Sequence, residues 1–127
     1  MKEGYLKSAE LFVEQATKQD QLFGLFDENE GWANCHAHDN KDAKAVYLFW
    51  SDPALAAKLQ SEEWANYQVQ AITLPVFFES WLDGMQREQV FAGVNWDHEL
   101  CGLEIEAMVL KNALIEKEQE LSKQAAE

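Results

Sequence analysis

The sequence has little positive charge. Only 10 residues are Lys or Arg, against 23 Asp or Glu, which gives a formal net charge of −13 over 127 residues. The excess is even: residues 1–63 contain 12 acidic residues and 6 Lys. A nucleic acid or an anionic membrane attracts clustered Lys and Arg, and no such cluster is present. We therefore expect neither among the partners, and the negative charge favours solubility.

Long apolar runs are also missing. The longest, Ala45–Trp50, has the length of a strand and falls far short of the roughly 20 residues that a membrane helix needs. Residues 1–21 are mixed in polarity and lack the apolar core of a secretory leader. The only cysteines are Cys35 and Cys101, and nothing directs them to an oxidising compartment. We expect two reduced thiols in a cytoplasmic protein.

Glycine and proline are scarce, with 6 and 2 residues, whereas 47% of the chain is hydrophobic. This composition excludes a disordered or collagen-like chain. The length suits a single domain that can bury its own core without disulfides or metal. We expect one domain over residues 1–127, with its core at about 5–115 and a charged helical tail over 116–127 that frays at its end.

Hydrophobic periodicity predicts alternating blocks of helices and strands. We expect helices over residues 8–19, 53–59 and 106–123, and another that begins at Thr73 and ends near Gly84. Strands are expected over residues 21–26, 32–38, 45–50, 67–72, 89–96 and 103–105. The order is α-β-β-β-α-β-α-β-β-α, in which residues 21–50 form an antiparallel meander. The fold class is therefore α+β, with a mainly antiparallel sheet and helices packed on it.

Capping residues and apolar stripes support these helices. Ser8 is the expected N-cap of the first helix. Ser51 or Asp52 caps the second, with Pro53 in its first turn, and Thr73 opens the third, with Pro75 in its first turn. The expected buried positions are Tyr5, Leu11, Phe12, Ala16, Val76, Phe77, Trp81, Leu82, Met85, Met108, Val109, Leu114 and Leu121.

Several short motifs occur together in a familiar order. They are Gly31-Trp32-Ala33, Trp50-Ser51-Asp52-Pro53 followed by Ala56-Ala57, Glu63-Trp64-Ala65-Asn66-Tyr67, Ala71-Ile72-Thr73-Leu74 and Phe77-Phe78-Glu79-Ser80-Trp81-Leu82. From Leu11 to Leu114 the chain resembles a bacterial family known only as domain of unknown function 2750. The resemblance implies an α+β domain and supplies no activity, cofactor or catalytic residue. Family members often have acidic residues near Cys35–His38, so the histidines at 36 and 38 are a departure.

Cysteine and histidine residues are the first candidates for chemistry. Cys35-x-x-His38 and His98-x-x-Cys101 together match the ligands of a zinc site. However, residues three apart on a strand point to opposite faces, and the glycines of a zinc knuckle are missing. His36 and His38 share a face and, with Asp39, could hold a transition metal weakly. An exposed polar strand end explains the same pattern.

A cysteine nucleophile is a further hypothesis. Cys35 or Cys101 beside a histidine would suit it, but a reactive thiolate needs a positive environment. Cys35 lies in a row of small residues, and Cys101 lies in an acidic turn. The carboxylate pairs Glu62–Glu63, Asp97–Glu99 and Glu104–Glu106 arise by chance in so acidic a chain, and the glycines match no phosphate-binding loop.

Five tryptophans are many for this length. Trp81 lies on the apolar stripe of its helix and fits a core position. Trp32 and Trp64 lie at the ends of elements, and Trp96 ends a strand. Tryptophan at such edges can anchor a binding partner.

We therefore predict a small acidic cytoplasmic protein that acts as a non-catalytic protein-binding or regulatory module. We assign no catalytic, cofactor-binding or metal-binding residue and no cofactor. The expected partner is a protein, which the charge suggests to be basic, and a homodimer through an open sheet edge or the last helix is a second expectation. One alternative is an immunity-type inhibitor of a basic toxin. The other is a small enzyme that uses Cys35, Cys101 or the His36–His38 pair, with or without metal.

Overall fold

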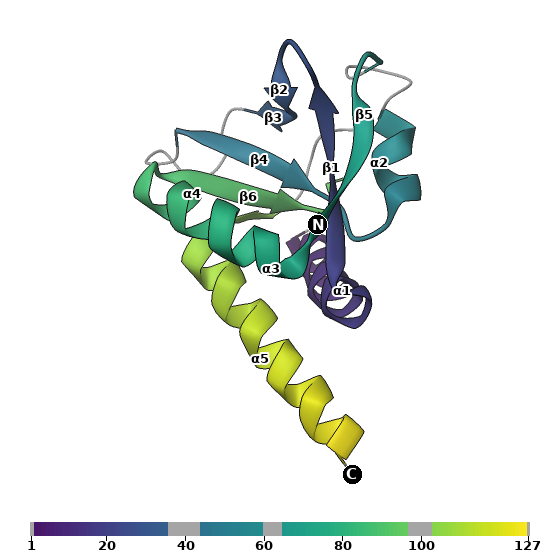
Figure 1. The fold of residues 1–127 in the computed structure, drawn as a ribbon, viewed down its shortest axis with the longest axis vertical. Coiled ribbons are helices and arrows are strands. Elements are labelled where there is room, and N and C mark those ends of the chain that lie inside the picture. Colours follow the sequence, from purple (N-terminus) through teal and green to yellow (C-terminus); the bar gives the residue numbers. More distant parts are fainter. Residues whose placement is uncertain (1, 36–43, 60–64, 97–102, 127) are drawn as a thin grey trace.

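A computed structural model describes residues 2–35, 44–59, 65–96 and 103–126. Figure 1 shows the arrangement of its helices and strands. In chain order these are α1 (Lys2–Gln19), β1 (Gln21–Asp27), β2 (Gly31–Trp32), β3 (Asn34–Cys35), β4 (Ala45–Phe49), α2 (Pro53–Leu59), β5 (Gln68–Thr73), α3 (Leu74–Val76), the π-helix η1 (Phe77–Leu82), α4 (Asp83–Arg87), β6 (Val90–Val94), β7 (Glu104–Ile105) and α5 (Ala107–Ala126). The α+β class is confirmed. No helix of the described residues is both long and apolar enough to cross a membrane.

The strands form two sheets, ordered β2-β1-β5 and β3-β4-β6-β7. Phe23 of β1 and Trp50, which follows β4, exchange backbone hydrogen bonds of 2.8 Å and so join the two sheets. Every neighbouring pair is antiparallel except β4 and β6, which are parallel. The prediction of a mainly antiparallel sheet is thus confirmed, although no pattern in the sequence indicated the parallel pair.

The prediction of one continuous strand over residues 32–38 is wrong. The chain changes sheets at Ala33, whose N–H donates to the carbonyl of Leu25 at 2.8 Å and whose carbonyl accepts from the N–H of Leu48 at 3.2 Å. Residues 31–35 therefore divide into β2 and β3. Because of this division, residues 21–50 form antiparallel pairs in two sheets instead of one meander.

The first helix begins earlier than predicted. Because α1 starts at Lys2, Ser8 lies inside the helix and is not its N-cap. Phe12 and Ala16 are buried as expected, but Leu11 is 45% exposed. The buried face runs through Ala9, Phe12 and Ala16, and Leu11 projects about 100° away from Phe12 around the helix.

The next two helix starts agree with the prediction. Asp52 Oδ1 accepts a hydrogen bond of 2.9 Å from the N–H of Ala54, and Pro53 is the first residue of α2. Thr73 is the N-cap of α3, which continues through η1 and α4 to Arg87. Val76 was expected in the core and is instead 46% exposed.

The last helix continues to Ala126, three residues beyond the predicted end. Leu114 is buried as predicted, whereas Val109 is 56% exposed and Leu110 takes the buried position. Val109 therefore points about 100° away from Leu110 around the helix axis and does not belong to the inward face.

Two apolar clusters lie on opposite sides of β4. Phe49 belongs to the larger cluster, which packs against α1, η1 and α5. Val46 and Leu48 belong to the smaller cluster, together with Trp50 and Trp96. Alternation along a strand produces this division, because successive side chains point to opposite faces. Figure 1 shows α3 and α4 along β6, and α2 beside β5.

Candidate functional site

The Cys–His hypotheses fall largely outside the described residues. Cys35 lies on β3 and is half-buried. His36, His38, Asp39, His98 and Cys101 lie outside the part of the chain that the structure describes, so neither the zinc set nor the histidine pair is tested. Within the described part there is no cluster of three or more potential metal ligands.

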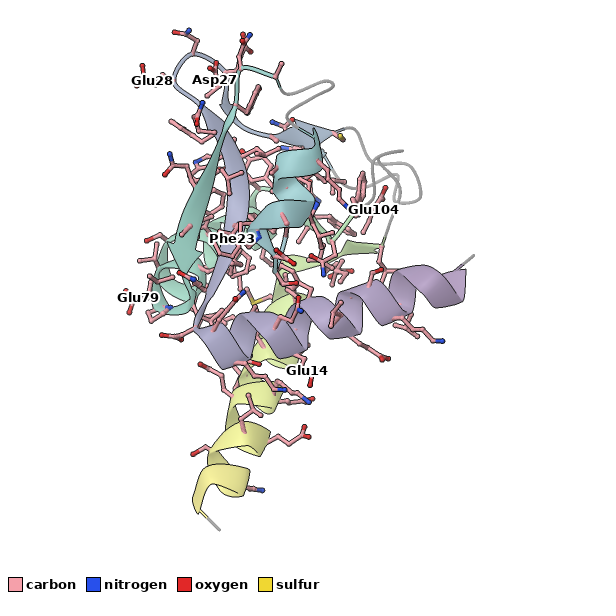
Figure 2. All side chains as sticks on the ribbon, turned by 90° about the vertical axis from the view of Figure 1, so that its right-hand side faces the viewer. Glu14, Phe23, Asp27, Glu28, Glu79 and Glu104 are labelled. Carbon is pink, nitrogen blue, oxygen red and sulfur yellow. The ribbon has the colours of Figure 1, made fainter. Side chains whose placement is uncertain are left out.

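The predicted carboxylate pairs are only partly described. Glu104 lies on β7 and is half-buried, and Glu106 is exposed immediately before α5. Figure 2 labels Glu104. Glu62, Glu63, Asp97 and Glu99 are not among the described residues.

Two tryptophans belong to the core. Trp50 is completely buried, and its Nε1–H donates to the carbonyl of Trp96 at 3.0 Å. Trp96 is 2% exposed, and its own Nε1–H donates to the carbonyl of Leu103 at 3.0 Å. The prediction that Trp96 is an edge anchor is therefore wrong, because its ring is buried and its Nε1–H is already hydrogen-bonded inside the protein. Trp64 lies outside the described residues.

The other two described tryptophans form a half-buried aromatic strip with two neighbours. Its members are Phe26, Trp32, Trp81 and Tyr47. The ring centroids of Phe26 and Trp32 are 4.9 Å apart, those of Trp32 and Trp81 also 4.9 Å, and those of Trp81 and Tyr47 6.1 Å. Tilted and edge-to-face contacts of this kind hold aromatic rings in defined orientations. The aromatic strip thus brings together β1, β2, η1 and β4.

Backbone features fix two members of the strip. A Cβ atom at Gly24 would lie 2.9 Å from Cε3 of Trp32, so the indole can rest on β1 only because residue 24 is glycine. Trp81 belongs to the π-helix η1, and π-helical turns occur often at functional sites. Beside Trp81 lies a hollow of about 220 Å³, which is lined by Tyr47, Gly84 and Glu88 among others.

Carboxylates flank the aromatic strip. Asp27 directly follows Phe26, and Glu28 and Glu30 are exposed in the same turn. Asp27 Oδ2 accepts from the N–H groups of Asn29 at 3.2 Å and Glu30 at 3.0 Å, which fixes the turn. Near the other end, the exposed Glu88 lines the hollow beside Trp81 and Tyr47. Figure 2 shows Asp27 and Glu28 together at the top of the view.

The negative turn also affects Tyr67. Burial raises the pKa of its phenol above the ordinary value of 10.0, and the charges of Glu30 and Asp27 raise this pKa further. The carboxylates of Glu30 and Asp27 thus lie close enough to Tyr67 to act on its phenol.

A polar cluster around Ser51 has a structural role. The Ser51 hydroxyl donates to Gln15 Oε1 at 2.5 Å and accepts from Asn95 Nδ2 at 3.0 Å. Asn95 Nδ2 also contacts the carbonyl of Ser8 at 3.3 Å. Amide side chains do not accept a proton at neutral pH, so this serine has no general base among these contacts. The cluster instead joins α1 to the ends of β4 and β6.

Sequence reasoning placed Trp32 at the end of an element and Trp81 against the core, where its ring contacts Phe49, but it did not predict that Trp81 is only half-buried. The available signal was the density of Phe77, Phe78, Trp81 and Leu82 within six residues, because one helical stripe cannot bury them all.

Comparison with known proteins gives one match. The family described as "Protein of unknown function (DUF2750)" matches residues 9–114, in agreement with the resemblance seen in the sequence. No curated protein and no solved structure matches the chain.

Proposed function

The chain belongs to the DUF2750 family of proteins of unknown function, and from this premise we propose that it is a non-catalytic protein-binding module whose contact surface is the aromatic strip. The observation that carries the proposal is the half-buried Trp32–Trp81 pair, with its centroids 4.9 Å apart. Tryptophan and tyrosine are the residues that most often dominate binding energy at protein interfaces. The rings are already held by their neighbours, so little side-chain entropy is lost on binding.

The proposed partner is a basic protein. Carboxylates of the β1–β2 turn and Glu88, which follows α4, flank the strip, and the whole chain carries a net charge of −13. Complementary charge accelerates association, and a cationic side chain can also stack on an indole face. A cytoplasmic location belongs to the same proposal. An immunity-type inhibitor of a basic toxin would be one form of this function, because it needs the same acidic and aromatic surface.

Differential capture from a native lysate of the source organism tests the proposal. The baits are the wild-type protein, Trp32→Ala and Val76→Ser, each checked by circular dichroism for its fold. Val76 is 46% exposed and lies outside the strip, so its replacement is the control. We expect a basic protein, identified by mass spectrometry, that the wild type and Val76→Ser retain, that Trp32→Ala loses, and that high salt weakens.

A second readout needs no partner. Acrylamide should quench part of the tryptophan fluorescence of the wild type, and Trp32→Phe should reduce that quenchable part. Capture that is equal for Trp32→Ala and the wild type, or the absence of any quenchable tryptophan, would refute the aromatic strip as the contact surface.

A further inference from the structure

An apolar groove of about 500 Å³ lies between α1 and α5, with β7 at one end. Leu6 of α1 and Val109 of α5 line it and are 52% and 56% exposed. Glu10 and Glu14 of α1 and Lys117 of α5 provide its charged rim. In Figure 2, Glu14 lies on α1, well below Asp27 and Glu28, and none of the residues that line the groove belongs to the aromatic strip.

The last helix supplies a segment of matching character. Figure 1 shows the C-terminal turns of α5 extending away from the rest of the fold. Leu114 is the last described residue of α5 that is buried, and Leu121, seven positions later, continues the same face of the helix. We call residues 115–126 the projecting end. A short helix without packing partners is only marginally stable in water.

We propose that the projecting end of α5 from a second copy of this chain fills the groove, so that two copies form a symmetric dimer. In an antiparallel pairing of the two α5 helices, Leu121 of the second copy lies against Val109 and Ala113. The two-fold axis makes the arrangement reciprocal, and each copy fills the groove of the other. The pairing is closed, so assembly stops at two copies.

One charge on the rim and one on the occupant are complementary, although the rim and the projecting end each contain one more carboxylate than ammonium. Glu14 is already engaged, because the ammonium of Lys18 lies 3.0 Å from its carboxylate. Among the described residues Glu10 has no ion pair, and neither does Lys123 in the last turn of the projecting end. The antiparallel pairing brings Lys123 of one copy toward Glu10 of the other, which gives each a partner of opposite charge.

The salt dependence distinguishes this dimer from the binding of a basic partner. Two copies that each carry a net charge of −13 repel one another. Added NaCl screens this repulsion, so the apolar dimer should become tighter, whereas binding of a basic partner should become weaker. An experiment can therefore refute the dimer without refuting the proposed function, and the reverse is also true.

Sedimentation velocity of the full chain, from micromolar to near-millimolar concentration and at low and high NaCl, tests the proposal. We expect a species of twice the monomer mass of 14.6 kDa, which grows with protein and salt concentration. Val109→Asp and Leu121→Asp should each weaken dimerisation by about 100-fold, because each substitution occurs twice in the interface. Val76→Asp, at an exposed valine away from the groove, is the matched control and should leave the dimer intact.

Mixing the two variants provides a second test. A mixed pair of Val109→Asp and Leu121→Asp keeps one intact contact, the unaltered projecting end in the unaltered groove, so the mixture should dimerise more strongly than either variant alone. A wild type that remains monomeric under all conditions overturns the proposal. A dimer that Val76→Asp weakens as much as Val109→Asp, or a mixture that shows no recovery, also overturns it.

Discussion

Two glycines allow two indole rings to lie against strands. A Cβ atom at Gly93 would come within 2.6 Å of Cε2 of Trp96 and 2.8 Å of Cδ2 of Leu48, and Gly24 admits Trp32 in the same way. Such distances require the neighbouring side chains to move. Glycine in these strands therefore serves close packing of side chains and not a special backbone conformation.

We predict that Gly93→Ala lowers the free energy of unfolding by about 1–3 kcal/mol, because the added methyl group overpacks the smaller core around Trp96. Urea denaturation measures the change. Gly4→Ala is the matched control, because no atom lies within 4 Å of its added Cβ and residue 4 is in α1. Its replacement should be neutral or should stabilise the protein by up to about 1 kcal/mol. Equal losses from both substitutions would contradict the packing explanation.

Tyr67 should titrate later than an ordinary tyrosine. Its pKa is raised first by burial and then by Glu30 and Asp27, so the folded state holds the phenolic proton more tightly than the unfolded state. The stability contributed by this group is complete below the ordinary pKa of 10.0 and is lost as the pH rises through the higher folded value. In a phenolate absorbance titration, Tyr67→Phe should remove the late component, and Glu30→Gln should shift it to lower pH. A late component unchanged in Glu30→Gln would eliminate Glu30 as a cause.

At the scale of elements, local signals predicted most of the boundaries. The turn at residues 27–31, the cap at Asp52 and the Thr73 start with Pro75 depend on neighbouring residues alone, so they can be read from sequence. The parallel pairing of β4 with β6 joins segments separated by α2, β5, α3, η1 and α4, and no local pattern specifies it. The switch of sheets at Ala33 likewise depends on the distant backbone groups of Leu25 and Leu48.

The candidate site was predictable only in part, for the same reason. Trp32 was placed correctly at the end of an element, but its contact with Trp81 is a tertiary one. Trp96 looks like an edge residue in the sequence. It is buried because Gly93 leaves room for its ring and the carbonyl of Leu103 accepts its N–H. Whether an aromatic ring is available to a partner or buried in the core depends on whether residues distant in the sequence pack over it.

Asn95 connects three elements, and its replacement should be costly. Its φ of 51° is in the left-handed region, and its Oδ1 accepts from the N–H of Ser51 at 2.9 Å. Asn95→Ala loses the side-chain hydrogen bonds and adds backbone strain, so we predict a loss of about 2–4 kcal/mol in the free energy of unfolding. Asn95→Gly loses the bonds without the strain and should be less destabilised. Chemical denaturation of both variants gives the order, and an alanine variant as stable as the glycine variant would refute the strain component.

At the scale of the whole molecule, charge and packing oppose each other. The ion pairs Glu14–Lys18, Asp83–Lys111 and Lys117–Glu120 each involve at least one largely exposed side chain. Such pairs contribute little to stability. The net charge of −13 instead produces repulsion among carboxylates throughout the folded chain. The two apolar clusters on either side of β4 must offset it.

The thermal unfolding midpoint should therefore rise with NaCl. Salt screens the repulsion between carboxylates more than it weakens the few exposed pairs, because the repulsion acts over distances comparable to the Debye length. Calorimetry at the lowest practical protein concentration separates this effect from self-association. The double substitution Glu28→Gln and Glu30→Gln, which removes two charges from the exposed turn, should make the midpoint less sensitive to salt than in the wild type. A midpoint that falls with NaCl would mean that the ion pairs stabilise the fold more than the repulsion between carboxylates destabilises it. A basic partner could then not stabilise the protein by reducing that repulsion.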